Sequence, residues 1–377
     1  MSTFHWTESH TARSARWHSE SATPRPNRVV VADDRMKADT AYRLACEGTA
    51  LLWRGDFHNA RQLLQAMRRR IDRKPPRPGD SPADSFHLHR RARSHRARVL
   101  SRLLVLLEGD YSLGLRRAPD VRQACSEAYG PPHGPLAVSF TELLGVIGAH
   151  QWRKTGVAVP ALDARIHPHY GVFSPVRGEY VDLVAHAPLP ASTDNRAARR
   201  TAFDLGTGTG VLAAVLAHRG IDHIVGTDIS PRALACAREN VRRLRFSGRI
   251  DVVGPSLFPD GRADLIVCNP PWIPARPTSA VELGVYDPDS TMLHSFLDGL
   301  SAHLEPGGEG WLILSDLAER LGLRTRSELL AAIETADLRV LDRTDTRPRH
   351  PRTRDTTDPL HAARAAEITS LWRLASN

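Results

Sequence analysis

The amino-acid sequence predicts an α/β protein, with a Rossmann-like, doubly wound sheet in its C-terminal half and an all-helical domain before it. From residue 201 onward, short apolar runs alternate with segments of helical periodicity, a pattern typical of a sheet covered by helices on both faces. Two of these runs lead into unusual loops, Asp204–Gly210 and Asn269–Trp272. Loops that follow parallel strands are where such sheets bind their ligands.

The elements of this half are predicted in chain order. Strands are expected at 201–205, 223–228, 250–253, 263–268, 310–315, 338–343 and 367–373, and helices at 211–218, 231–244, 291–303 and 325–336. The last two strands form a closing pair, joined by a long loop at 344–366 that is rich in Arg, Thr, Pro and His. The sequence leaves the role of that loop open.

The chain before residue 201 is predicted to contain three parts. Residues 1–35 are rich in Ser, Thr, Arg, His and Pro and lack apolar periodicity, so a disordered leader is expected. Residues 36–156 carry helical patterns separated by proline-rich loops and are predicted to be an all-helical domain. Residues 157–200 shift to short β-like segments and turns and are predicted to link it to the domain at 201–377.

The formal net charge is +9, which invites a nucleic-acid interpretation. However, Lys37, Lys74 and Lys154 are the only lysines, and the chain is rich in Arg, Ala, Gly and Pro. A GC-rich genome explains this skew better than selection for a phosphate-binding surface. The Arg/His run at 87–98 is interpreted in the same way, as the solvated face of a helix.

The four cysteines are scattered, without the spacing of a metal site, which fits reduced thiols in a cytoplasmic protein. The first residues contain no apolar run of a secretory signal. No stretch approaches the roughly 18 apolar residues that a membrane helix requires. His167 and His169 lie close together, but no third ligand has suitable spacing, so no metal is predicted.

The loop Asp204-Leu-Gly-Thr-Gly-Thr-Gly210 follows a predicted strand and opens a predicted helix. Glycines let the backbone turn sharply and approach a ligand closely, and the N–H groups at the helix start favour an anionic group. Taken alone, the loop also satisfies the looser dinucleotide fingerprint. Asp228 ends the next strand, where its carboxylate can accept both hydroxyl protons of a ribose.

The segment Asn269-Pro-Pro-Trp272 is more specific. Two prolines directly after a parallel strand cannot continue the ladder, so they favour a rigid loop. In such a loop the side-chain oxygen of Asn269 and the carbonyl oxygen of Pro270 can point the same way. Both can then accept hydrogen bonds from one NH₂ group on a planar carbon. Trp272 offers a flat wall for a planar substrate or a cationic methyl group.

With the glycine loop upstream, this segment resembles the class I S-adenosylmethionine-dependent methyltransferases that carry an Asn-Pro-Pro-aromatic motif, in the methyltransferase small-domain superfamily. The resemblance implies a seven-stranded sheet, S-adenosylmethionine as cofactor, and Asn269, Pro270 and Trp272 as catalytic residues. The segment from His167 to Tyr180 also resembles the β-hairpin with which protein-glutamine methyltransferases cover their cofactor. Residues expected at the cofactor are Phe173, Pro175, Arg177, Asp204, Gly206, Thr207, Gly208, Thr209, Gly210, Asp228, Ile229, Ser256, Leu257 and Asn269.

The predicted function is methylation of a planar nitrogen (an amide, a guanidino group or an exocyclic amine) on a small molecule or a protein. One alternative is a guanine-N2 methyltransferase acting on rRNA or tRNA, because Ser256-Leu-Phe-Pro resembles a segment of those enzymes. The other is a non-catalytic protein that binds RNA or a partner on a methyltransferase scaffold. Intact Gly206, Asp228 and Asn269 argue against the last.

Overall fold

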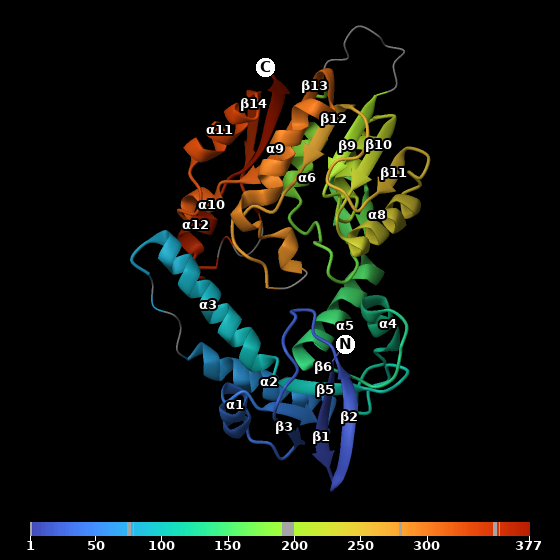
Figure 1. The fold of residues 1–377 in the computed structure, drawn as a ribbon, viewed down its shortest axis with the longest axis vertical. Coiled ribbons are helices and arrows are strands. Elements are labelled where there is room, and N and C mark those ends of the chain that lie inside the picture. Colours follow the sequence, from blue (N-terminus) through green and yellow to red (C-terminus); the bar gives the residue numbers. More distant parts are fainter. Residues whose placement is uncertain are drawn as a thin grey trace. The chain divides into compact units, whose positions relative to one another are not determined.

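The computed structural model describes residues 2–73, 77, 79–190, 200–278, 281–349, 353 and 355–377 (Figure 1). The chain divides into an N-terminal unit, Met1–Asp80 with Asp84–Gln151, and a C-terminal unit, Ser81–Ala83 with Trp152–Asn377. Both motif loops belong to the C-terminal unit.

The C-terminal unit is built on a seven-stranded sheet. Its strands are β9 (Thr201–Leu205), β10 (His223–Thr227), β11 (Ile250–Val253), β12 (Ala263–Cys268), β13 (Leu304–Ser315), β14 (Leu338–Thr346) and β15 (Thr369–Ser376), in the spatial order β11-β10-β9-β12-β13-β15-β14. The first five strands of that order run parallel, and β15 is antiparallel to both of its neighbours. A two-stranded antiparallel sheet of β7 (Val157–Val159) and β8 (Ala164–Ile166) precedes it, followed in the chain by α6.

Helices cover both faces of this sheet (Figure 1). Side chains of α6 (Glu179–His186), α7 (Val211–His218) and α8 (Pro231–Arg243) pack into one hydrophobic cluster, and those of α9 (Thr291–His303) and α11 (Arg326–Thr335) pack into another. Local sequence signals start two of them: Ser230 caps α8 ahead of Pro231, and Thr325 with Glu328 forms a capping box on α11. The short helices α10 (Leu317–Arg320) and α12 (His361–Ala365) complete the unit.

The predicted all-helical domain is wrong. The N-terminal unit contains a six-stranded mixed sheet of β1 (Thr3–Glu8), β2 (Thr11–Trp17), β3 (Val29–Ala32), β4 (Ala50–Trp53), β5 (Leu103–Leu107) and β6 (Leu136–Ser139), in the order β1-β2-β6-β5-β4-β3. Its helices are α1 (Ala38–Cys46), α2 (Phe57–Asp72), α3 (Pro82–Leu100), α4 (Arg122–Tyr129) and α5 (Phe140–Thr155).

The error has a physical cause. Strands β4 and β5 are short runs of apolar residues buried on both faces and paired in parallel, so they show no alternation of polar and apolar residues. Such runs cannot be told from the buried part of a helix by periodicity. Both strands lie within residues 36–156, which were therefore predicted to be helical throughout apart from their loops.

The predicted disordered leader at 1–35 also disagrees with the structure, because β1, β2 and β3 lie within it. Phe4 and Trp6 alternate with polar residues along β1, and Ala15 and Trp17 do the same on β2; all four are buried. Period-two alternation is the mark of a half-buried strand. The Ser- and Arg-rich composition hid this pattern.

Candidate functional site

Three neighbouring parallel strands end in one row. Leu205 of β9 pairs with Thr227 of β10 on one side and with Cys268 of β12 on the other. The glycine loop, Asp228 and the Asn-Pro-Pro-Trp segment are the next residues of these three strands, so they leave the sheet side by side. The chain connections reverse direction between β9 and β12, the switch point at which open α/β sheets bind ligands.

The glycine loop depends on a backbone that only glycine adopts readily. Gly206, Gly208 and Gly210 have φ angles of +69°, +56° and +79°, in the left-handed region. A Cβ atom on Gly206 would lie 2.6 Å from Cε of Met292, at the start of α9. The loop leads directly into α7, and the first N–H groups of this helix favour binding of an anion.

Asp204 shapes the loop from inside the protein. Its Oδ2 atom accepts hydrogen bonds from the Thr207 hydroxyl (2.6 Å) and from the Ala213 N–H (2.9 Å), and the residue is 1% exposed. Burial raises the pKa of this carboxyl to about 6, although the two hydrogen bonds oppose the shift. Thr207 and Thr209 are also buried, so these three predicted cofactor residues also serve to hold the loop.

Asp228 touches the glycine loop directly. Its Oδ2 atom accepts from the Gly208 N–H (3.0 Å), and its Oδ1 atom accepts from the Ser230 N–H (2.8 Å). Burial raises the pKa of Asp228, and these backbone hydrogen bonds oppose the shift. The next residue, Ile229, is 71% exposed, the highest value for a large apolar side chain among the described residues. An acidic group beside an uncovered apolar surface suits a ligand with hydroxyl groups and a flat ring.

Ser256 and Leu257 follow β11 and are half-buried. The Thr227 hydroxyl, at the end of β10, donates to the Leu257 main-chain oxygen (2.5 Å), so this segment lies against the same row of strand ends. Phe258 then stacks on His303 of α9, with ring centroids 4.2 Å apart. The structure therefore brings the segment of Ser256 and Leu257, two of the predicted cofactor residues, to the end of β10, next to Asp228.

The Asn-Pro-Pro-Trp segment has an internal hydrogen bond. The indole N–H of Trp272 donates to Oδ1 of Asn269 over 2.9 Å. Pro270 is buried, whereas Asn269 and Trp272 are half-buried. Trp272 packs against both hydrophobic clusters of the sheet, and Arg177 lies over its ring with the guanidinium carbon 5.3 Å from the centroid.

The segment before α6 carries Phe173, Pro175 and Arg177, and it brings Arg177 to the ring of Trp272. Phe173 packs against the backbone of Gly284, where an added Cβ would come within 2.9 Å of it, and Pro175 is buried. Arg177 donates from Nη2 to Oε2 of Glu367 (3.0 Å), so its guanidinium is engaged by protein carboxylate. Its position over Trp272 places Arg177 beside the expected substrate contact.

Sequence reasoning missed Asn240, which is 1% exposed on α8. Its Nδ2 donates to the main-chain oxygens of Thr209 (3.0 Å) and His167 (3.2 Å), and its Oδ1 accepts from the His167 N–H (2.8 Å). The Asn240 side chain is thus hydrogen-bonded both to the glycine loop and to the segment that precedes α6. An asparagine in an Arg-rich amphipathic helix carries no signal that separates it from surface residues.

Asp287 was missed as well. Its carboxylate accepts from the N–H groups of Met292 and Leu293 at the start of α9, and its own N–H donates to the Ile273 oxygen (2.9 Å). Asp287 therefore joins Ile273, the residue directly after the Asn-Pro-Pro-Trp segment, to the start of α9. This arrangement resembles the N-terminal cap of a helix.

The two histidines noted in the sequence have protein partners. His167 Nδ1 lies 2.7 Å from the Arg153 oxygen, and His169 Nε2 lies 2.7 Å from Oε2 of Glu239. Within the described parts of the chain, no three His, Cys, Asp or Glu side chains are grouped as metal ligands. None of the described helices is both long and apolar enough to cross a membrane.

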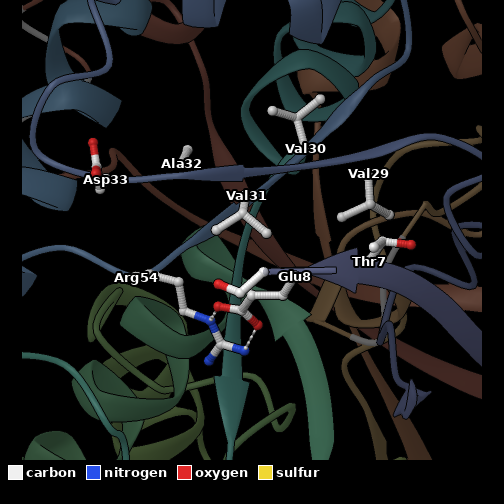
Figure 2. Close-up of a pocket in the computed structure, with 9 residues that line it drawn as sticks. Thr7, Glu8, Val29, Val30, Val31, Ala32, Asp33 and Arg54 are labelled. Carbon is white, nitrogen blue, oxygen red and sulfur yellow. Dashed lines mark hydrogen bonds and ion pairs between the residues drawn. The ribbon is translucent and has the colours of Figure 1, made fainter. Parts of the chain in front are cut away.

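A cavity of about 500 Å³ lies in the N-terminal unit, between β1 and β3 (Figure 2). Its wall includes Val29, Val31 and Thr7, together with Arg54 and Glu8, which form an ion pair (2.7 Å). The two motif loops contribute nothing to this cavity.

In comparison with known proteins, a family model matches part of the C-terminal unit. Residues 163–319 match the model of the methyltransferase small domain. The chain is 35% identical, over 164 residues, to the release factor glutamine methyltransferase of Cereibacter sphaeroides, covering 40% of this chain and 57% of that protein. It is 32% identical, over 97 residues, to the ribosomal protein L11 methyltransferase of Vibrio vulnificus, covering 26% of this chain and 33% of the relative.

Among solved structures, the ribosomal protein L11 methylase of Lactobacillus delbrueckii subsp. bulgaricus aligns with 54% of this chain and 83% of its own, at 18% identity and a TM-score of 0.35. The chain spans little more than half the length of the first curated relative and a third of the second. The matched residues contain the glycine loop, Asp228 and the Asn-Pro-Pro-Trp segment. Residues 163–319 thus belong to the methyltransferase small-domain family, whose members depend on S-adenosylmethionine.

Proposed function

We propose that this protein transfers a methyl group from S-adenosylmethionine to a planar nitrogen of a protein or small-molecule substrate. The observation that carries the proposal is the row of strand ends, where Leu205 pairs with both Thr227 and Cys268. In this row the glycine loop, which suits the methyl donor, lies next to Asn269. The side-chain oxygen of Asn269 suits the nitrogen that would accept the methyl group. Bound there, S-adenosylmethionine supplies an electrophilic methyl group on a sulfonium.

The described residues fit that cofactor. Three left-handed glycines and the N-terminus of α7 suit its carboxylate end, and Asp228 suits ribose hydroxyl groups. Ile229, 71% exposed, supplies apolar surface for a flat base. The loop carrying these groups is held by Asp204 and Asn240, so it is organised before a ligand arrives.

On the acceptor side, Asn269 Oδ1 and the Pro270 carbonyl are the groups that would accept the two N–H bonds of an amide or guanidino nitrogen. Holding both bonds orients the nitrogen lone pair towards the donor loop and removes much of the orientational entropy of the reaction. The same oxygens stabilise the positive charge that develops on the nitrogen, and the proton can leave after transfer. Trp272 offers a flat surface beside them.

The named relatives act on proteins, a release factor glutamine in one case and ribosomal protein L11 in the other. These two names support a protein substrate as the first to test. The N-terminal unit, which lies outside the matched residues 163–319, is the proposed source of substrate recognition.

The test is transfer of a labelled methyl group from S-adenosylmethionine by the full-length protein. Acceptors are a purified release factor, purified L11, and a cell extract separated into protein, RNA and metabolite fractions. Label should appear in protein or metabolite and resist nuclease, and Asn269→Ala should abolish most of it. Label confined to nuclease-sensitive RNA would move the proposal to a nucleic-acid substrate, and no label in any fraction would overturn it.

A further inference from the structure

The hydrogen bond between Trp272 and Asn269 sets the orientation of the Asn269 side chain. An indole N–H is only a donor, so the carboxamide atom that faces it is the oxygen and not the NH₂ group. A carboxamide oxygen has two lone pairs, and Trp272 occupies one of them. The other remains for an incoming N–H, while Nδ2 of Asn269 points to a different side.

Trp272 is in turn held by a buried ion-pair cluster. Arg177 lies over the indole ring, and it pairs with Glu367 through Nη2 (3.0 Å) and with Glu179 through Nε (3.3 Å). The two glutamates are 1% and 6% exposed, and the Ser315 hydroxyl donates to Glu367 Oε1 (2.7 Å). Cation–π contacts of this kind hold their partners most strongly when they are shielded from water.

The ion-pair cluster links residues near β13, β15 and α6 to Oδ1 of Asn269 through Trp272. Ser315 ends β13, next to β12 in the sheet, and Glu367 lies two residues before β15 begins. Arg177 precedes α6 in the segment that also carries Phe173. A displacement of Arg177 would therefore reach Asn269 through the indole ring of Trp272.

We propose that Trp272 is a positioning residue. Its indole N–H sets the Asn269 carboxamide so that one lone pair of Oδ1 faces the acceptor nitrogen, and the ion pair of Arg177 with Glu367 keeps the indole in place. The part that concerns the acceptor rests on the proposed function, whereas the hydrogen bond does not. Phenylalanine would keep the flat wall of Trp272 but would free the amide to rotate, because it carries no N–H.

The first measurement is solvent exchange of indole N–H protons by NMR in the ligand-free, full-length protein, with the Trp272 signal assigned from Trp272→Phe. The Trp272 proton should exchange more slowly than that of Trp152, which is 50% exposed. Asn269→Ala should speed its exchange at least tenfold, and Arg177→Ala should do so more than Arg177→Lys. Unchanged exchange in Asn269→Ala would overturn the proposal.

The second measurement is a double-mutant cycle on the acceptor that takes up label. Trp272→Phe should lower kcat about tenfold, the scale of one neutral hydrogen bond, with little change in cofactor affinity. Adding Trp272→Phe to Asn269→Ala should cost no further activity, because the residue that Trp272 orients is already gone. Additive losses would mean that Trp272 acts independently of Asn269 and would overturn the positioning role.

The NMR exchange tests whether Trp272 orients Asn269, and the double-mutant cycle tests whether that orientation matters for methyl transfer. If no acceptor takes up label, the proposed function fails, and the NMR exchange still decides whether Trp272 orients Asn269.

Discussion

The side-chain amide of Asn240 donates a hydrogen bond to the main-chain oxygen of Thr209 over 3.0 Å, and it also donates to the oxygen of His167 over 3.2 Å. Thr209 lies in the glycine loop, and His167 lies 12 residues before α6 begins at Glu179. Two segments of the site, more than 40 residues apart in the chain, are thus joined through one buried side chain. The geometry of the cofactor loop depends on a helix that contributes no predicted cofactor contact.

Asn240→Ala should therefore weaken both stability and cofactor binding. It leaves the buried Thr209 carbonyl and the half-buried His167 N–H without this partner, at a cost of about 1–3 kcal/mol. Asn240→Asp keeps the acceptor for the His167 N–H but loses both donated bonds, so it should also be destabilising. Thermal unfolding and calorimetric titration with S-adenosylhomocysteine measure the two effects. Wild-type values for both variants would contradict this role.

Asp228→Ala should weaken binding of S-adenosylmethionine and S-adenosylhomocysteine by about 1–3 kcal/mol, the scale of leaving partner groups unpaired. The variant also loses the acceptor for the Gly208 N–H, so the loop itself should loosen. Asp251→Ala on β11, where the side chain is 65% exposed, is the matched control and should bind normally. Stabilisation of the wild-type protein by NAD, but by neither sulfur compound, would contradict the cofactor assignment.

Asp204 predicts a pH dependence of stability. Burial raises the pKa of its carboxyl to about 6 in the folded protein, against about 3.9 in an unfolded chain. Between these pH values the folded protein holds a proton that the unfolded chain has lost, so the free energy of unfolding falls as pH rises. The loss is on the order of 2–3 kcal/mol.

Asp204→Asn tests this dependence, because the carboxamide oxygen can accept the same two hydrogen bonds but does not titrate. Urea unfolding from about pH 4 to pH 7 should show a flatter profile for this variant than for the wild type. A residual slope is expected from Asp228, whose pKa burial shifts in the same direction. Asp298→Asn, exposed on α9, removes the same charge from the surface and is the matched control. An unchanged profile in Asp204→Asn would count against the assignment.

The sheet of the C-terminal unit could be predicted because its signals are local. Strands such as Thr201–Leu205 and Ala263–Cys268 were predicted with the bounds that the structure shows, since each is an apolar run bordered by glycine or proline. Helices α7 and α9 were also placed correctly, with a glycine before α7 and a polar residue before α9. The N-terminal sheet was not found, because β4 and β5 have no period of two and β1 is short and rich in polar residues.

The candidate site also divides into residues with a local sequence signal and residues without one. Gly206, Asp228 and Asn269 stand next to strand ends, where sequence motifs are informative, and the structure brings them together. Asn240 and Glu367 act over sequence separations of 31 and 190 residues, towards Thr209 and Arg177. No local pattern reports such contacts. The hydrogen bond from Trp272 to Asn269 spans only three residues, but it depends on a rotamer and not on residue type alone.

Generic RNA should bind weakly at physiological salt. Several arginines are paired with carboxylates, as in Arg117 with Asp56 and Arg373 with Glu309, so the total of 51 Lys and Arg residues overstates the number of cations available to phosphate. Fluorescence anisotropy with a labelled RNA, between 50 and 200 mM salt, should give a shallow dependence of log K on log salt. Tight binding with a steep slope, lost in Arg91→Ala with Arg93→Ala on α3, would contradict this interpretation of the charge.

The most direct test of the central claim is the effect of Asn269→Ala on turnover compared with its effect on cofactor affinity. Because Asn269 is assigned to the acceptor nitrogen, kcat for the acceptor that takes up label should fall at least about 10²-fold, the scale of losing one preorganised polar group at a reacting centre. The dissociation constant of S-adenosylhomocysteine should change far less. Asn269→Asp keeps the acceptor atoms but adds a charge, so it should retain more activity on a cationic guanidino group than on a neutral amide. Full turnover by Asn269→Ala would contradict the nitrogen-binding mechanism, even with the fold and the cofactor loop unchanged.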